Sequence, residues 1–548
     1  MLEDGLRTSK YNYQFRLLLT RLYAKLGAFE RCMEHFDHLE IKYIQHDTLS
    51  HYWLTHAAPL GHFSRAILLH NKALKFFSAT FRDTSEYLIQ AYRFGSFAKV
   101  PEFMRLRDRL THSLQYSLVY VESLIYDLVL ETDSHQRTEE RIAAMALDPV
   151  TDQTNWDLIQ DNRDLKLMAD WTAVTMDAQE ERHQRGCRHE KAWTKLRHVT
   201  HHAVSAVVSF AAADGKHNEN DSGAANGDAA AHNGAGDALP PPPQSKTKTP
   251  VDLEIVTRLV TDFRQHVEFC RREFADGAGA KEEKDRLAVI HPLYASPPSR
   301  LFDYLAFGHP LDILVDSFAL VEYVFSFPAA FSGKSVDAAA KEVVNEKMET
   351  MLQTGLLEGF KKMFDACLSA TLSTGAFSTS GESTSTPLQH DLYLHNFSVA
   401  LETLALVVAL LGACHKVLRP LKNSLSKKMK KKKGGGGGAG GGAGAPKMFV
   451  NFVSATSAIR DEANEFGERL RGIAVQLALS DVGLDASMRN LTVDDEDVDA
   501  ESREASTSTP TTPADILTRM NDSYATSAAE MSTLTAKKVA YLTSLTRL

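Results

Sequence analysis

Three short segments, Leu26-Gly27-Ala28-Phe29, Leu60-Gly61-His62-Phe63 and Phe94-Gly95-Ser96-Phe97, follow one another at intervals of 34 residues. Each has a glycine after a bulky apolar residue, and a phenylalanine two positions after the glycine. Glycine accepts a turn conformation that side chains resist at the end of a helix. The phenylalanine is expected to lock the second helix of a hairpin onto the first. The repeat therefore predicts a stack of helical hairpins.

A period of 34 residues is typical of tetratricopeptide-type repeats. Two further sets of equivalent positions support the register, because they hold residues suited to close helix packing: Leu19, Trp53 and Tyr87, and Cys32, Ala66 and Val100. The fold class predicted from this pattern is all-α, a tetratricopeptide-like helical-repeat solenoid followed by an irregular helical region with disordered insertions. No period-2 strand pattern occurs in the sequence.

Local signals give expected helix ends within the repeats. In each hairpin the first helix is named A and the second B. Asp47 and Asp83 are predicted to be the N-caps of the A helices of the second and third hairpins, and Asp83 has a glutamate three residues on. Pro59 should end the second A helix early. Pro101 is expected in the first turn of the third B helix, where proline is tolerated.

Composition shifts divide the chain into eight predicted segments. Low-complexity or charged stretches with little to bury are interpreted as linkers. The segments are 1–147, tetratricopeptide-like repeats; 148–210, a continuing helical region; 211–250, a disordered linker; 251–424, a second helical region; 425–446, a Lys-rich then Gly/Ala-rich segment; 447–486, a helix; 487–512, an acidic Ser/Thr/Pro linker; and 513–548, a C-terminal helix.

The overall composition argues against nucleic-acid-binding, disulfide-rich, secreted and membrane-spanning proteins. The net charge of −9 over 548 residues does not favour a nucleic-acid-binding protein as a whole. Five scattered cysteines without CxxC spacing favour a reducing compartment over a disulfide framework. The first residues show no signal peptide, and the apolar run 399–413 contains Glu402 and is too short to span a bilayer. We therefore expect a soluble, cytoplasmic protein without a membrane partner.

The sequence offers no catalytic constellation. Arg469-Leu-Arg-Gly472-Ile-Ala474 resembles the R/Q-x-x-G-x-G/A turn that binds the acetyl-CoA pyrophosphate in acetyltransferases. That turn needs free N–H groups at the start of a helix, whereas the residues before Arg469 carry charges at helical spacing. We therefore expect the motif to lie inside a helix, with no catalytic residue and no cofactor-binding residue in the chain.

Two groups of histidines could suggest a metal. The first is His35 and His38 beside Glu34, and the second is His198, His201 and His202 with Cys187 and His189 upstream. Neither group supplies four ligands at a recognisable zinc spacing, so the sequence predicts no metal site.

A run of lysines is the strongest interaction signal outside the repeats. It comprises Lys427, Lys428, Lys430, Lys431, Lys432 and Lys433, and a Gly/Ala stretch follows it. Such a run can attach to RNA phosphates by releasing counterions. It can equally be a solvated charge block or a nuclear-import-like patch, because lysine alone does not specify a partner. Both interpretations stay open.

Several segments resemble, in the same order along the chain, the auxiliary subunit of NatB, an N-terminal acetyltransferase complex that acts on nascent chains. They include 43–48, 83–92, 100–103, 107–110, Trp156 with 161–165 and Trp171, and 417–421 before the lysine run. Members of that family are longer at the N-terminus, so the chain is expected to correspond to their C-terminal part, either as a fragment or as a truncated gene model.

The resemblance implies a non-catalytic scaffold that binds the small catalytic subunit of NatB and helps to dock it at the ribosome. The complex would acetylate N-termini that begin Met-Asp, Met-Glu, Met-Asn or Met-Gln, with acetyl-CoA held by the catalytic subunit alone. A generic helical-repeat adaptor with a peptide groove, of the chaperone or trafficking type, is the alternative. An enzyme that uses the 469–474 motif is a third possibility, and it would need a sheet that the sequence does not show.

Overall fold

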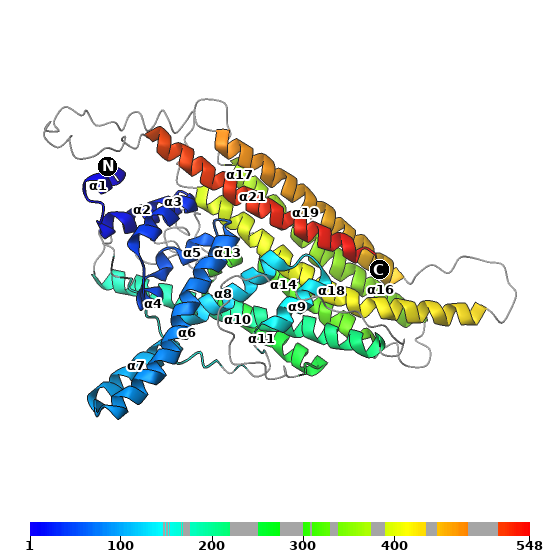
Figure 1. Ribbon diagram of the computed structural model, residues 1–548. Helices are drawn as coiled ribbons and strands as arrows, with labels where there is room; N and C mark the ends of the chain where they lie inside the picture. Colours follow the sequence, from blue (N-terminus) through cyan, green and yellow to red (C-terminus); the bar gives the residue numbers. More distant parts are fainter. Residues whose placement is uncertain are drawn as a thin grey trace, which may run out of the picture.

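The structure is a computed structural model. It describes residues 1–145, 148, 152, 154–165, 167, 176–219, 250–274, 300–306, 309–328, 338–373, 390–433, 447–479 and 513–547 (Figure 1). Every regular element in these ranges is a helix, which confirms the all-α prediction. The one isolated bridge within them joins Ser113 to Gln160.

The N-terminal part contains nine α-helices and two 3₁₀ turns among the described residues. Their bounds are α1 (Leu2–Thr8), α2 (Tyr13–Lys25), α3 (Phe29–Leu39), α4 (Gln45–Thr48), η1 (Ser50–Tyr52), α5 (Leu54–Ala57), α6 (Phe63–Arg93), η2 (Phe97–Lys99), α7 (Val100–Thr111), α8 (Leu114–Glu131) and α9 (His135–Ala144).

The three repeat glycines all adopt left-handed backbone conformations. Their φ angles are 75° at Gly27, 85° at Gly61 and 66° at Gly95, values that side chains resist. Phe29 and Phe63 are fully buried behind the first two turns. Phe97 differs, because 59% of its surface is exposed and its ring contacts Tyr92 of the same turn. The expected packing of the phenylalanine therefore holds for two hairpins and not for the third.

The predicted caps at Asp47 and Asp83 are wrong. Asp47 lies inside α4, fully buried, and its carboxylate accepts a hydrogen bond from the Ser113 hydroxyl instead of capping a helix. Asp83 lies in the middle of α6, which joins two predicted helices in one run of 31 residues. No glycine or proline interrupts residues 63–93, so the local capping signal did not stop the helix. Pro101 does lie in the first turn of α7.

The second half of α6 and α7 form an arm that projects from the body of the protein (Figure 1). Many of its apolar side chains are exposed to solvent. They are Tyr87, Ile89, Tyr92, Phe94, Phe97 and Met104.

Longer helices build the rest of the described structure. They are α10 (Met176–Glu219), α11 (Leu253–Phe274), α13 (Leu301–Ala306), α14 (Pro310–Phe325), α16 (Ala338–Thr350), the π-helical turn η4 (Met351–Leu357), α17 (Glu358–Ser373), α18 (His390–Lys433), α19 (Lys447–Leu479) and α21 (Pro513–Leu545). α10 passes residue 210, where the sequence analysis places the start of a linker. α18 likewise contains the backbone of all six lysines of the run, because lysine is a good helix former. Residues 220–249, 434–446 and 480–512, which hold most of the predicted linkers, lie outside the described residues.

α18 is the central helix of the core. Its segment Leu394–Leu425 is long and apolar enough to cross a membrane by length and composition, but all of the tested window is buried inside the protein. It packs against α10, α14 and α21. The apolar run 399–413 is therefore part of a core helix that other helices surround.

A buried group of charges joins α18 to three other helices. Glu402 of α18 meets Arg300, whose nitrogen lies 2.6 Å from one carboxylate oxygen, and Arg197 of α10, 2.9 Å from the other. Arg197 also pairs with Glu122 of α8 at 2.6 Å, and Tyr304 of α13 donates its hydroxyl to Glu402 at 2.8 Å. Because each charge has partners, the group cross-links the helices without leaving a buried charge unpaired.

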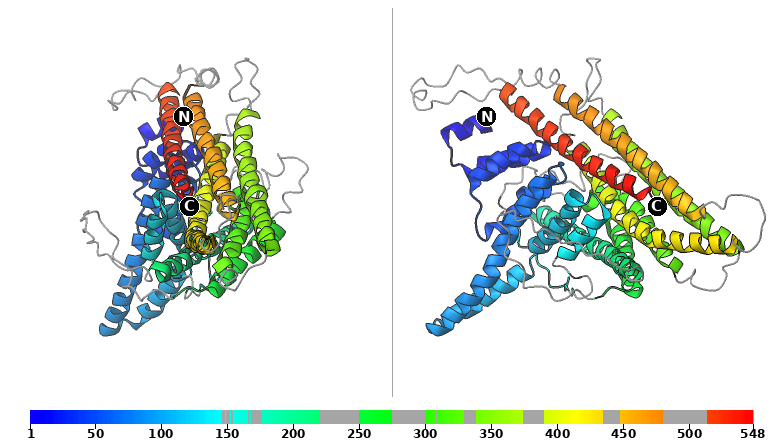
Figure 2. Two further views of the ribbon diagram at one scale, coloured as in Figure 1. Left: turned by 90° about the vertical axis from the view of Figure 1, so that its right-hand side faces the viewer. Right: turned by 45° about the vertical axis from the view of Figure 1, so that its right-hand side comes forward.

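Helix α21 packs both against α19 and against the N-terminal repeat hairpins. It runs beside α19 in the opposite direction in all the views of Figures 1 and 2. Its first half also crosses the turns of the repeat hairpins. Ser64 at the start of α6 donates its backbone N–H and its hydroxyl to Glu530, each at 2.7 Å, and the N–H of Glu30 at the start of α3 donates to Ser523 at 3.1 Å. The hairpins and the C-terminal helices therefore form one packed body.

Candidate functional site: a cavity with an aspartate and two histidines

A cavity with a volume of about 1150 Å³ lies between α10 and α11. α10 forms one wall and α11 another, and the segment that contains Asp152, Thr154 and Trp156 closes a third side. Its lining combines apolar and polar side chains and carries both charges, with Arg188 and Lys195 on α10 and Asp262 and Glu273 on α11.

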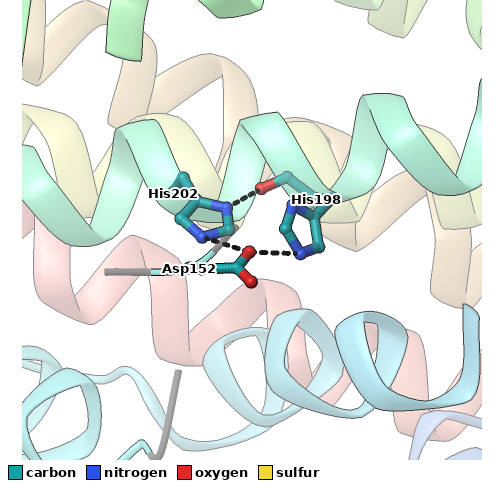
Figure 3. Close-up of side chains that lie close together, drawn as sticks. All are labelled: Asp152, His198 and His202. Carbon is teal, nitrogen blue, oxygen red and sulfur yellow. Dashed lines mark hydrogen bonds and ion pairs between the residues drawn. The ribbon is translucent and has the colours of Figure 1, made fainter. Parts of the chain in front are cut away.

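Three side chains of the lining converge on one point (Figure 3). The Nε2 atom of His198 lies 2.9 Å from Oδ2 of Asp152, and the Nε2 atom of His202 lies 3.2 Å from the same oxygen. The two histidines are one helical turn apart on α10, so they share a face of that helix. Possible ligand atoms of all three residues lie within 4.8 Å of one another.

Hydrogen bonds orient His202 and Asp152, and a ring contact orients His198. Nδ1 of His202 lies 2.7 Å from the backbone carbonyl of His198, which can only accept, so this nitrogen carries the proton. The Thr154 hydroxyl donates to Oδ1 of Asp152 at 3.0 Å and leaves Oδ2 facing the histidines. The Trp156 ring packs edge-on against His198, with ring centres 5.2 Å apart.

One polar atom of the cluster has no hydrogen bond. Nε2 of His202 is buried and makes none within the described structure, although it is at ion-pair distance from Asp152. With the proton on Nδ1, a neutral His202 turns its Nε2 lone pair toward a carboxylate oxygen. Two electron-rich atoms therefore face each other at 3.2 Å unless a cation lies between them or His202 is protonated.

Burial and the neighbouring groups lower the pKa values of Asp152 and His198. Burial alone would raise the pKa of Asp152, but the contacts with His198 and His202 outweigh burial and hold this pKa well below its usual range. Burial lowers the pKa of His198, although Asp152 opposes the effect. The two shifts favour the deprotonated carboxylate and the neutral imidazole, the forms in which these groups bind metals.

The other residues singled out in the sequence do not join this cluster. His201 points to Met145 and Ser205, and His189 packs on Phe274. His35 stacks on Tyr23 near Glu3, and His38 is exposed. The pattern His198-x-x-x-His202 was visible in the sequence, but nothing local pointed to Asp152 as the third member.

The acetyl-CoA-like motif lies within α19, as predicted. Arg469 is on an exposed helix face, where it pairs with Glu465, and Arg471 donates to the Ser532 hydroxyl of α21 at 2.7 Å. The N–H groups of the motif are engaged in the helix. The side chains of the six lysines, from Lys427 to Lys433, lie outside the described residues, so their contacts are not part of this site.

A family model described as the "N-acetyltransferase B complex (NatB) non catalytic subunit" matches residues 1–165, which include the repeat hairpins and Asp152. The "N-alpha-acetyltransferase 25, NatB auxiliary subunit" of Rattus norvegicus is 29% identical over 482 residues, 87% of this chain and 44% of that protein. Its Homo sapiens counterpart is 29% identical over 434 residues, 78% of this chain and 39% of that protein.

Among solved structures, "The NatB Acetyltransferase Complex Bound To CoA and MES" aligns with a TM-score of 0.37 at 13% identity, over 84% of this chain and 47% of the matched chain. The chain spans less than half the length of the curated relatives named above. Those relatives carry the name of an auxiliary subunit, and the similarity extends over most of this chain. Over most of its length the chain is similar to NatB auxiliary subunits, and its residues 1–165 match the family model of the NatB non-catalytic subunit.

Proposed function

We propose that this chain is a non-catalytic scaffold that binds the catalytic subunit of NatB and holds it near the ribosome, where the complex acetylates nascent N-termini beginning Met-Asp, Met-Glu, Met-Asn or Met-Gln. The observation that carries the proposal is the family similarity over most of the chain. The fold supports it, because α21 ties the hairpins to the C-terminal helices in one extended helical body suited to holding a partner.

Co-expression tests the first part. The tagged chain, co-expressed with a NatB catalytic subunit, should retain that subunit through purification and raise its acetylation of a Met-Asp peptide. The chain alone should transfer no acetyl group and show no acetyl-CoA binding by calorimetry, because the 469–474 motif is helical. Failure of the catalytic subunit to co-purify, or acetyl-CoA binding that Gly472→Glu abolishes, would contradict the scaffold assignment.

The ribosome contact rests on the lysine run at the end of α18. If the lysines neutralise RNA phosphates, the affinity should fall with salt on a log–log plot with a slope of roughly −0.7 per engaged lysine on single strands. Replacing Lys427, Lys428 and Lys430 to Lys433 with glutamine should lower co-sedimentation with ribosomes at low salt and flatten the slope, while binding of the catalytic subunit is retained.

A charge-matched control separates the run from general charge. Lys10, Lys42, Lys75, Lys99, Lys362 and Lys447 are six exposed lysines elsewhere among the described residues. Their replacement with glutamine should leave the slope unchanged. Equal salt curves for the parent and the six-lysine variant would return the run to a solvated charge block.

A generic helical-repeat adaptor remains the second candidate, and the α6–α7 arm favours it. Phe94 and Tyr92 are 76% and 65% exposed there, and exposed apolar side chains gathered on one part of a protein are typical of protein-binding surfaces. Phe94→Asp should then abolish capture of a partner other than the catalytic subunit. Tyr11→Asp is the matched control, because Tyr11 is 95% exposed on a different element.

A further inference from the structure

We propose that Asp152, His198 and His202 form a zinc site whose fourth position opens into the cavity between α10 and α11. The site is independent of the scaffold function above. It would give the chain a bound metal where neither the sequence pattern nor the similarity to the family assigns one.

The donor set and its spacing fit zinc. Two histidines four residues apart on one helix face, joined by a carboxylate from another segment, are ligands that zinc accepts. In a tetrahedral site with metal–ligand distances of about 2.0–2.1 Å, neighbouring ligand atoms are about 3.3 Å apart. Here the two histidine–carboxylate separations are 2.9 and 3.2 Å, so small side-chain adjustments would admit the ion.

The lone-pair geometry of His202 provides an independent argument. Its Nδ1 donates to the His198 carbonyl, so the buried Nε2 is left without a hydrogen bond and directed at Asp152. A divalent cation between Nε2 and Oδ2 would satisfy both atoms at once. An imidazole whose other nitrogen donates to a carbonyl is also the usual arrangement of a metal-bound histidine.

The surrounding contacts complete the site. Thr154 fixes the carboxylate of Asp152 through Oδ1, and Trp156 restricts the ring of His198. Such outer contacts orient metal ligands and tune affinity. Because all three ligands line the cavity, the fourth position would be filled by water or by a small donor that enters from it. Nitrogen ligands favour zinc over magnesium or calcium, which prefer oxygen.

The test uses the full chain after dialysis against a chelator. Calorimetric titration with zinc sulfate should show one equivalent bound with sub-micromolar affinity, unaffected by excess magnesium. Cobalt substituted for zinc should give the visible absorption of a four-coordinate site. Protein purified without added metal should carry one zinc per chain by elemental analysis.

Variants tie the metal to these residues. Asp152→Asn and His202→Gln should each reduce zinc affinity more than about 100-fold, and Thr154→Val, which removes only the orienting hydrogen bond, about 10–100-fold. His189→Gln is the matched control, because His189 lines the same cavity on the same helix outside the cluster. Far-UV circular dichroism verifies folding. If a ligand variant unfolds, Thr154→Val decides the question alone.

Two results would overturn the proposal. One is folded parent protein that neither carries zinc nor binds it at micromolar concentrations, which would identify the cluster as a hydrogen-bonded Asp–His–His triad. The other is zinc binding that persists unchanged in Asp152→Asn and His202→Gln, which would place the metal elsewhere.

Discussion

The hydroxyl of Ser527 donates a hydrogen bond of 2.6 Å to the carbonyl of Leu60, the residue before the second repeat glycine. Just before it on α21, Tyr524 donates to the carbonyl of Leu26, the residue before the first repeat glycine. One helix from the end of the chain thus contacts equivalent carbonyls of two successive repeats. At the third turn, a Cβ on Gly95 would meet nothing within 4 Å among the described residues.

Gly61→Ala should therefore destabilise the protein more than Gly95→Ala. Both glycines have positive φ, which costs an alanine about 1–2 kcal/mol. At Gly61 the added Cβ would also collide with the Ser527 hydroxyl oxygen and lie 2.9 Å from the Met531 methyl carbon. Loss of the buried Ser527 hydrogen bond adds about 1–3 kcal/mol. Free energies of unfolding from urea titrations measure both changes, and equal values would show that α21 does not hold the second turn.

The two phenylalanines that follow these glycines make a second matched pair. Phe63 is fully buried and packs edge-on against Tyr126, with ring centres 5.7 Å apart. Phe63→Ala should cost about 3–5 kcal/mol. Phe97→Ala, at the same repeat position, should cost much less because that ring is mostly exposed. Arg65→Ala, at an exposed position near Phe63, should also cost little. If thermal melting shows Phe63→Ala and Phe97→Ala to be level, the packing described for the second hairpin is wrong.

The repeat was predictable because its signals are local. A glycine that must adopt positive φ and an aromatic two positions later mark each turn in the sequence itself. The exposure of Phe97 in the third hairpin was not predictable, because Phe97 satisfies the same sequence pattern as the buried Phe63. Its exposure depends on where α21 ends its contact with the turns, and that is set by residues more than 400 positions away.

The candidate site shows the same limit. The sequence shows the spacing of His198 and His202, but it does not show four ligands at a recognisable zinc spacing. Asp152 joins them only through tertiary structure, and a zinc site with three protein ligands and a water would need no fourth protein ligand. The caps predicted at Asp47 and Asp83 failed for a related reason: burial and an uninterrupted helix outweighed a local hydrogen-bonding preference.

Removing the central carboxylate should be costly. Glu402→Gln keeps the shape of the side chain but leaves Arg197 and Arg300 buried with less negative charge beside them. Breaking one side of a buried ionic group costs about 3–5 kcal/mol. Glu102→Gln is the control, since Glu102 pairs with Lys99 at an exposed position and its loss should not be measurable. Guanidinium unfolding of the two variants would compare them, and a small effect at Glu402 would mean that water reaches the group.

Lys538 predicts an unusual dependence of stability on pH. Its ammonium group is buried, 2.8 Å from the Thr132 hydroxyl oxygen, and burial lowers its pKa to about 7, with Lys537 adding to the effect and Asp133 and Glu131 opposing it. In the unfolded chain the pKa is about 10.4, so between these values the unfolded state binds more protons than the folded state. Stability contributed by this residue should therefore increase as pH rises through the folded pKa.

The expected gain between pH 7 and pH 9 is about 2 kcal/mol, because each unit of difference in bound protons contributes about 1.4 kcal/mol per pH unit. Lys538→Met has no such titration, so the stability of the parent minus that of the variant should grow by this amount over the range. Lys537→Met, at the adjacent exposed position, should follow the parent. Free energies of unfolding in urea at several pH values measure all three proteins. Parallel curves for the parent and Lys538→Met would show that Lys538 stays charged in the folded protein, held by the carbonyl oxygens of Thr132 and Leu128.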